Sequence, residues 1–430
     1  MEHLVSSWYN DRSLPESYIL PPEDRPGMLP LGKNIPVVDL GAHDQTDILQ
    51  QILEASQEFG MFQVINHGVP SNLIDEAMGV FKEFHALSAE DKAIETSKDP
   101  DKSCYMYTSS HNYATEKYHF WRDGLFHHCN PLEKYIQFWP EKPPKYREVV
   151  ATYTAELRKV VFRILEFIAQ GLGLNPDHFS SELCENQVVL VNHYPPCPDP
   201  SLTLGLCKHR DPIVINILLQ SDVYGLEVLK DEEWIGVEPI PYAFVVTLGV
   251  LMQIISNGKL KGAVHRVVTN SNLARTTATF GLHPLYETLI EPAEALVDAS
   301  NPALWKVGVV SKESEEESKE SFATTPSSGG EEGRPANMPL VKSHSSDFLV
   351  PVDISGVLPL PSPSSSHHYQ KRVIAVTPTV PATLGSHRSA HPIVKAKALS
   401  DRTDNPEQNP TKNGQKTHHT RPHAPPEFFA

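Results

Sequence analysis

The sequence lacks the cysteine patterns of zinc-binding and disulfide-rich proteins. Its five cysteines are Cys104, Cys129, Cys184, Cys197 and Cys207, an odd number at irregular spacings with no CxxC pair. Zinc sites and disulfide frameworks need regular spacings, so neither is expected here. We therefore expect reduced thiols in a reducing compartment, with the cytoplasm as the location.

Long apolar runs and an excess of positive charge are also missing. No stretch approaches the roughly 18 apolar residues that span a bilayer, and MEHLVSSWYNDRSLPES lacks the apolar segment of a secretory signal. The formal net charge is −16, which argues against nucleic acid or an anionic membrane as the main partner. We expect a soluble monomer that acts on a small molecule, without nucleic acid or membrane.

The composition changes twice along the chain and divides it into three parts. Residues 1–180 alternate strand and helix signals, with a helix capped by Ser71 and a longer helix over 144–172. Residues 181–305 contain eight short β-type runs separated by turn residues, which is typical of a barrel or a double-sheet jelly roll. Residues 306–430 are rich in Ser, Pro, His and charge, and this composition predicts a disordered tail.

Three residues in the middle part are the strongest candidates for a metal site. His209 and Asp211 lie two apart in LGLCKHRDPIVINILLQ, which otherwise has the pattern of a strand. Residues two apart on a strand point to one face, so these side chains project together while Arg210 points away. His265 follows in KGAVHRVVTN, at the start of another β-rich run. Two imidazoles and a carboxylate on converging strands make the facial triad that holds Fe(II).

Such a triad leaves three positions of the metal open, enough for a 2-oxo acid and dioxygen. The distal carboxylate of the 2-oxo acid then needs a cation with a fixed fork, which arginine supplies. Arg275 and Thr277 alternate onto one face of LARTTATFGL, so a guanidinium and a hydroxyl can share that carboxylate. Asn192 and Tyr194 alternate likewise in VNHYPPCP and can contact the chelating end.

The combined motifs resemble the plant 2-oxoglutarate- and Fe(II)-dependent dioxygenases. The matching segments are FGMFQVINHGVP, VNHYPPCPDPSLTLGL, the pair His209 and Asp211, GLEVLKDEEWIGVEPIP, ISNGKLKGAVHRVVTN and RTT at 275–277. Within that family, SSWYNDRSLPESYILP and FWPEKPPKYREVVATYTAELRKV are most similar to the hyoscyamine 6-dioxygenase group. The likeness runs from residue 1 to about 305.

The resemblance implies a mainly β fold, a double-stranded β-helix (jelly roll) with flanking helices. It implies that Fe(II) is bound by the triad and that O2, 2-oxoglutarate and the reductant ascorbate take part. The co-substrate contacts that it implies are Arg275 and Thr277 for the C5 carboxylate, with Tyr194 and Asn192 beside them. The implied reaction decarboxylates 2-oxoglutarate to succinate and CO2 and hydroxylates, or epoxidises, a small alkaloid-like specialised metabolite.

Several positions depart from the family's pattern. Cys207 and Lys208 stand where a small or Pro pair is usual, Arg210 fills the variable slot between the first two ligands, and Thr247 and Val250 stand where Asn and Asp are usual. After Trp305 the family continues into a helix that closes over the substrate, whereas this chain turns into low-complexity sequence. We expect that lid to be missing or replaced.

Two alternatives stay open. One is an ascorbate-dependent oxidase of the same family that does not use 2-oxoglutarate. The other is a catalytically inactive homologue with a damaged C-terminus.

Other histidines and aromatic residues have more ordinary interpretations. We expect His67 to be a turn residue satisfied by the backbone and His193 to be structural or exposed to solvent. We expect His127 and His128 to lie in a surface loop, with a place at the substrate mouth as the alternative. Substrate contacts are sought among the aromatic residues between 105 and 126, about half of which are expected in the core: Tyr105, Tyr107, Phe120, Trp121 and Phe126.

Overall fold

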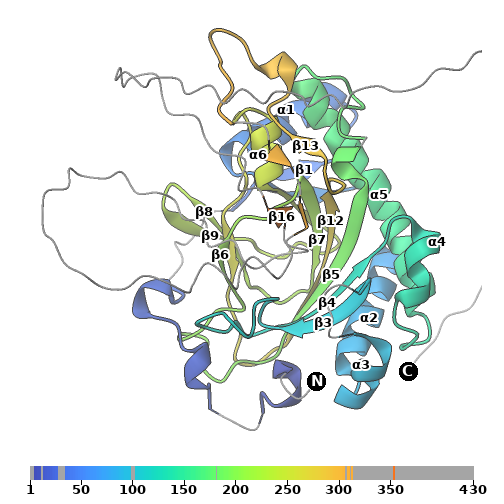
Figure 1. The fold of residues 1–430 in the computed structure, drawn as a ribbon, viewed down its shortest axis with the longest axis vertical. Coiled ribbons are helices and arrows are strands. Elements are labelled where there is room, and N and C mark those ends of the chain that lie inside the picture. Colours follow the sequence, from blue (N-terminus) through green and yellow to red (C-terminus); the bar gives the residue numbers. More distant parts are fainter. Residues whose placement is uncertain are drawn as a thin grey trace, which may run out of the picture. The chain divides into compact units, whose positions relative to one another are not determined.

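Two β-sheets form the core of the part of the chain that the structure describes (Figure 1). The computed structural model describes residues 4–10, 13–27, 34–97, 102–180, 182–305, 308–309, 311–312 and 352–353. The chain divides into two units, Met1–Ser364 and Ser365–Ala430. The second unit lies outside the described residues.

The larger sheet has eight strands in the order β1-β2-β10-β7-β12-β5-β4-β3. Its strands are β1 (Val37–Asp39), β2 (Met61–Ile65), β3 (Cys104–Thr108), β4 (Asp123–His128), β5 (Asn186–Tyr194), β7 (Ile215–Gln220), β10 (Phe244–Leu248) and β12 (Arg275–His283). The first four strands in sequence thus join the same sheet as the later ones. The division of the chain at residue 180 stays a prediction.

The smaller sheet has four strands in the order β6-β11-β8-β9. Its strands are β6 (Leu206–His209), β8 (Leu226–Lys230), β9 (Glu233–Gly236) and β11 (His265–Val267). One apolar cluster joins the two sheets, because it combines Tyr194 and Val245 of the larger sheet with Leu206, Val228 and Val267 of the smaller one. The expected mainly β, double-sheet jelly roll is therefore confirmed.

Strand alternation gives the larger sheet two different faces. On β12, Ala278, Phe280 and Leu282 are buried in the main hydrophobic cluster together with residues of the helices. The intervening residues Thr277 and Thr279 face the other way, into the space between the sheets. The outer face of this sheet therefore supports the fold, and its inner face is free to carry polar groups.

Helices cover the outer face of the larger sheet, where α2 contacts β5 and β12 and α5 contacts β7 (Figure 1). The α-helices are α1 (Gln45–Glu58), α2 (Ser71–Ala86), α3 (Ala89–Glu95), α4 (Leu132–Tyr135), α5 (Tyr146–Gly171) and α6 (Val250–Ile255). Short 3-10 turns are η1 (Val5–Ser7), η2 (Glu16–Tyr18), η3 (Pro22–Asp24), η4 (Ile136–Phe138), η5 (Glu182–Cys184) and η6 (Glu294–Leu296). None of the described helices is long and apolar enough to cross a bilayer.

The two longest helices begin and end close to where the sequence predicts, but one cap differs. The α5 stripe is buried from Leu157 to Ile168, as its apolar spacing indicates. For α2, however, the expected Ser71 cap is wrong. Pro70 occupies the cap position in an extended conformation, so Ser71 is already the first helical residue and no side chain caps the helix.

The tail expected from residue 306 lies almost entirely outside the described residues, and so does the expected loss of a lid. The described parts are two-residue strands: β14 (Gly308–Val309) pairs with β13 (Leu289–Ile290), and β15 (Ser311–Lys312) pairs with β16 (Val352–Asp353).

Candidate metal centre

The three candidate ligands meet between the sheets. His265 on β11 pairs directly with His209 on β6, and the two ring centroids lie 4.1 Å apart. Asp211 follows β6, with its Oδ1 3.4 Å from His209 Nε2 and 3.7 Å from His265 Nε2. One ligand atom from each residue lies within 4.8 Å of the others, and all three residues are buried. A single metal ion could contact all three.

Asp211 reaches this position from a loop, because β6 ends at His209. The expectation that both residues belong to one strand is therefore wrong for Asp211. Its carbonyl oxygen accepts a 2.9 Å hydrogen bond from the backbone N–H of Val250, at the start of α6. A Cβ on Gly249 would lie only 2.0 Å from the carbonyl oxygen of Ile213. Glycine at this position thus lets α6 approach the loop closely and hold it in place.

Backbone carbonyls orient both imidazoles. Nδ1 of His209 lies 2.8 Å from the carbonyl oxygen of Cys207, and Nδ1 of His265 lies 3.1 Å from that of Ala263. A carbonyl oxygen only accepts hydrogen bonds, so both Nδ1 atoms carry the proton. The Nε2 lone pairs then face Asp211, which is the tautomer that a metal ligand requires.

The protonation states also suit a metal. Burial alone would raise the pKa of the Asp211 carboxyl, but the His265 and His209 rings and the Asn216 amide outweigh burial and lower the pKa to about 2. Burial, with a contribution from His209, lowers the pKa of His265 to about 4. At neutral pH the site therefore presents a carboxylate beside a neutral imidazole. Two nitrogens and one carboxylate oxygen on one side of a site are the donor set of non-haem Fe(II).

Asn216 is a site residue that the sequence reasoning missed. It lies on β7, and its Nδ2 donates a 2.5 Å hydrogen bond to Oδ2 of Asp211. This bond leaves Oδ1 directed at the two imidazoles. The signal was present in the sequence, since Asn216 is a polar residue in the apolar run PIVINILLQ.

A pocket between the sheets joins the triad to the candidate co-substrate residues. Six of the seven predicted site residues line it, and only His209 does not. The six are Asn192, Tyr194, Asp211, His265, Arg275 and Thr277. Cross-strand pairing explains this grouping, because Arg275 on β12 stands opposite Tyr194 on β5, and Thr277 stands opposite Asn192. The two alternating pairs found in the sequence thus form one patch.

Arg275 lies at the end of the pocket in a fixed position. Its Nε donates to the carbonyl oxygen of Val223 at 3.1 Å, its Nη2 donates to Gln220 Oε1 at 3.2 Å, and its guanidinium lies 5.4 Å from the Tyr194 ring centre. The side chain is 2% exposed, and burial lowers its pKa, although Tyr194 acts in the opposite direction. Among the described residues, no carboxylate forms an ion pair with Arg275.

Two of the positions that depart from the family pattern point away from the metal side. Lys208 and Arg210 are exposed, and Arg210 donates to the carbonyl oxygen of Gly262 at 3.1 Å. The expectation that Arg210 points away from the site is confirmed. Thr247 does line the pocket, whereas Val250 contacts the ligand loop through its backbone.

The remaining histidines differ in how well they were predicted. His67 bonds the carbonyl oxygen of Tyr242 and the N–H of Val69, so the turn interpretation is confirmed. His193 is structural, since its Nδ1 lies 3.0 Å from Thr276 Oγ1. The expectation that His127 and His128 lie in a surface loop is wrong, because both lie on β4.

The aromatic candidates between 105 and 126 are mostly core residues. All except Tyr107, which is partly buried, are less than a tenth exposed. Tyr105 and Phe126 pack on the inner face of the larger sheet, next to Leu190, which lines the pocket. Trp121 instead packs against the N-terminal segment.

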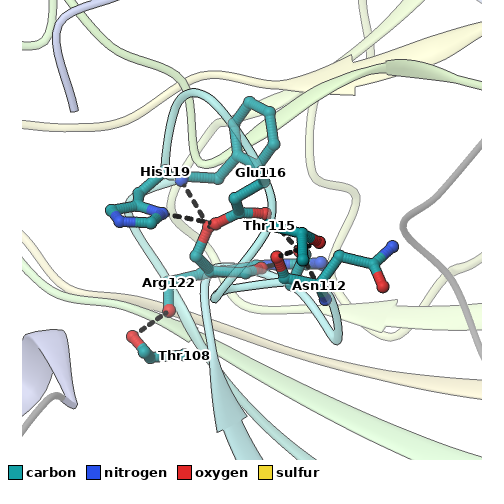
Figure 2. A network of polar contacts seen from close by, with 9 residues as sticks. Thr108, Asn112, Thr115, Glu116, His119 and Arg122 are labelled. Carbon is teal, nitrogen blue, oxygen red and sulfur yellow. Dashed lines mark hydrogen bonds and ion pairs between the residues drawn. The ribbon is translucent and has the colours of Figure 1, made fainter. Parts of the chain in front are cut away.

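The loop over residues 109–122, which connects β3 to β4, carries a second polar network (Figure 2). Glu116 lies at its centre, where it contacts Nδ1 of His119 at 2.6 Å and accepts hydrogen bonds from the hydroxyls of Ser109 and Ser110. Arg122 donates from Nε to the carbonyl oxygen of Ser109 at 2.7 Å. No sequence motif indicated this network.

Comparisons with known proteins agree with this geometry. Residues 185–284 match the 2OG-Fe(II) oxygenase superfamily, and residues 35–142 match the N-terminal region described as non-haem dioxygenase in morphine synthesis. Hyoscyamine 6-dioxygenase of Hyoscyamus niger is 43% identical over 318 residues, which cover 71% of this chain and 92% of that protein. The chain belongs to the 2OG-Fe(II) oxygenase superfamily.

The similarity extends to a further dioxygenase and to a solved structure. Flavanone 3-dioxygenase 2 of Oryza sativa subsp. japonica is 39% identical and covers 70% of this chain and 89% of its own length. A crystal structure of JOX2 in complex with 2OG, Fe and JA superposes with a TM-score of 0.65 at 36% identity, and covers 70% of this chain and 89% of that one. This oxygenase is thus an oxidoreductase, a 2-oxoglutarate-dependent dioxygenase with Fe(II) as its metal.

Proposed function

We propose that His209, Asp211 and His265 bind the Fe(II) of this oxygenase. The proposal is supported by their separation of less than 4.8 Å, by the two Nδ1–H groups held by carbonyls and by the ionised Asp211. Asn216 keeps the carboxylate turned so that one oxygen faces the imidazoles. Fe(II) bound here with 2-oxoglutarate and O2 supplies the oxidation that converts a C–H bond to C–OH, with succinate and CO2 as co-products.

Arg275 and Thr277 bind the distal carboxylate of 2-oxoglutarate, with Asn192 and Tyr194 beside it. The single observation that supports this most is a buried guanidinium in the same pocket as the triad, with no carboxylate partner among the described residues. A buried charge without a partner is costly, and a dicarboxylate co-substrate neutralises it. The rigid hold of Gln220 and Val223 on Arg275 positions its fork before the co-substrate arrives.

The substrate is a small specialised metabolite. The 43% identity with hyoscyamine 6-dioxygenase supports an alkaloid-like scaffold as one candidate. A neutral, oxygen-bearing ring compound is the other. It is favoured by the pocket lining, in which the only described acidic residue is the candidate metal ligand Asp211. An ammonium group in that pocket would lack a carboxylate of its own.

The chain acts as a monomer in the cytoplasm, with residues 181–305 as its catalytic part. The five cysteines are all free, which suits a reducing compartment. The candidate ligands and co-substrate residues all fall between Asn192 and Thr277. Gel filtration with light scattering tests the monomer, since a mass of twice the chain would contradict it.

The decisive experiment measures succinate formed by the purified chain with Fe(II), 2-oxoglutarate, ascorbate and O2. We expect slow succinate formation without substrate, its loss on chelation, and a KM for 2-oxoglutarate raised about 10- to 100-fold in Arg275→Leu, because hydrogen bonds to charged groups contribute about 1.5–3 kcal/mol. Arg275→Lys keeps the charge without the fork, so its KM for 2-oxoglutarate should lie between those of wild type and Arg275→Leu.

Other outcomes distinguish the alternatives. Product formed with ascorbate but without stoichiometric succinate would identify the oxidase that does not use 2-oxoglutarate. Fe(II) bound in anaerobic equilibrium dialysis, but without any succinate, would identify an inactive homologue.

A further inference from the structure

The row of inner-face residues on β12 continues beyond the co-substrate patch. Arg275, Thr277 and Thr279 line the pocket, and the same alternation brings Gly281 and His283 to the inner face, since the pairing with β5 runs without interruption to His283. Gly281 pairs with Asn216, the residue that holds Asp211. His283 thus lies one inner position beyond Gly281, about 7 Å further along the strand, on the side away from Arg275.

The His283 imidazole is buried without a complete set of partners. The residue is 3% exposed, and no hydrogen-bond partner reaches its Nε2 among the described residues. Burial lowers the pKa of this ring to about 3, with His128 acting in the same direction and Asp211 in the opposite one. The ring is therefore neutral at physiological pH and has one nitrogen available for a hydrogen bond.

The groups around His283 form a wall of rings next to the metal pocket. His128 lies on the inner face of β4, where its Nδ1 is 3.1 Å from Oδ1 of Asn186, the cross-strand neighbour of His283. The His128 ring packs edge-on against Phe126, with centroids 5.2 Å apart. Phe126 belongs to a cluster that also contains Leu190 of the pocket lining and Ile213 of the ligand loop. The wall is thus continuous with the pocket.

We propose that His283 recognises the substrate of this oxygenase, and that the substrate is a neutral ring compound with a hydroxyl oxygen, held against the Phe126 wall. This inference rests on the proposed function of the triad. A neutral imidazole offers a hydrogen bond to such an oxygen, and an aromatic wall favours a flat ring. A protonated amine finds no carboxylate among these wall residues. The distance along β12 lets one molecule contact His283 while another part of it lies at the metal.

The test compares two ring compounds that differ in their hydroxyl groups. Naringenin carries phenolic hydroxyls and unsubstituted flavanone has none, while hyoscyamine serves as the amine probe. Substrate-dependent succinate is measured with the full chain, with His283→Leu, with His283→Gln and with the control His43→Leu, whose imidazole is exposed.

We expect wild type to use naringenin with a higher kcat/KM than hyoscyamine. His283→Leu should raise the KM for naringenin about five- to tenfold, the effect of one lost hydrogen bond, and change that for flavanone less than twofold. His283→Gln, which keeps a donor and an acceptor, should restore most of the difference, and His43→Leu should match wild type. If the leucine variant folds poorly, the glutamine variant still tests the inference through its KM for naringenin.

Three results would overturn the inference. They are equal effects of His283→Leu on both ring compounds, a higher kcat/KM for hyoscyamine than for naringenin, and no rise in succinate with naringenin. By contrast, a wild-type chain that forms no succinate under any condition would overturn the proposed function itself.

Discussion

The metal centre and the 109–122 loop are both dense polar networks, but their contacts have different origins. At the metal centre, cross-strand pairing joins His209 to His265, and strand alternation brings further residues to the same inner face. In the loop, Glu116 gathers Ser109, Ser110 and His119 without any strand or helix to set their spacing. The regular strand period allows much of the first network to be predicted from the sequence, whereas the loop has no such period and the second network could not be predicted.

The two networks are nevertheless connected. Arg122, at the end of the loop, donates from Nη1 to Oδ1 of Asn192 at 3.4 Å, and Asn192 lines the pocket. Asp123, the next residue, accepts hydrogen bonds from the backbone N–H groups of Val5 and Ser6 at 2.8 Å each. The loop therefore joins the N-terminal segment to the wall of the pocket. We expect changes in the loop to act on stability and changes at the centre to act on metal binding.

The largest effect is expected from a change at the metal centre, where it should lower metal affinity. Asn216→Leu removes the amide that holds Asp211 Oδ2 while it keeps a side chain of similar size. Metal affinity should fall about 10- to 100-fold, as for other partners of metal ligands, in anaerobic equilibrium dialysis with Fe(II). Asn216→Gln, whose longer amide can still donate, should lose less. Unchanged affinity in the leucine variant would show that the two neighbouring imidazoles alone orient Asp211.

A smaller effect is expected from the loop side. Glu116→Gln removes the charge and one of the two acceptor oxygens, so either the Ser110 hydroxyl or both Ser109 and His119 lose their acceptor. The free energy of unfolding should fall by about 1–3 kcal/mol, measured by urea denaturation, with Fe(II) affinity unchanged. Glu133→Gln, on the exposed helix α4, is the matched control and should unfold like wild type. A loss of metal affinity in Glu116→Gln would contradict the separation of the two networks.

The smallest expected effect is a loss of stability at acid pH, caused by His127 on the outer face of the larger sheet. The ring of His127 is fully buried, with its Nε2 3.0 Å from the Tyr146 hydroxyl, and burial lowers its pKa to about 3. The unfolded chain takes up this proton near pH 6.5, so the stability is present above that pH and is lost as the pH falls. The loss amounts to at most about 1.4 kcal/mol per pH unit.

His127→Gln should reduce that loss. Urea denaturation at pH 7.5 and pH 5.5 gives the difference in unfolding free energy for each protein, and His43→Gln, at an exposed position, serves as the control. The same pH dependence in both variants would mean that other buried histidines, such as His193, account for the acid sensitivity.

The pattern of the middle part of the chain predicted the strands well. The eight β-type runs correspond to β5 through β12, because alternating apolar residues and turn residues are local signals. Errors arose where a neighbour in space decides the outcome. His127 and His128 look like loop residues in the sequence, yet pairing with β5 makes them part of a strand. Ser71 has the chemistry of a helix cap, but the helix already begins after Pro70.

The sequence by itself determined which residues are candidate ligands, the alternating faces of β5 and β12 and the double-sheet architecture, because residue types and the period of two along a strand are local signals. Only the tertiary structure decided that Asn216 holds Asp211, that Arg275 is buried without an acidic partner among the described residues, and that His283 lies beyond the metal site. These facts depend on which strands become neighbours, and strand order is a property of the packed sheet that no local period encodes.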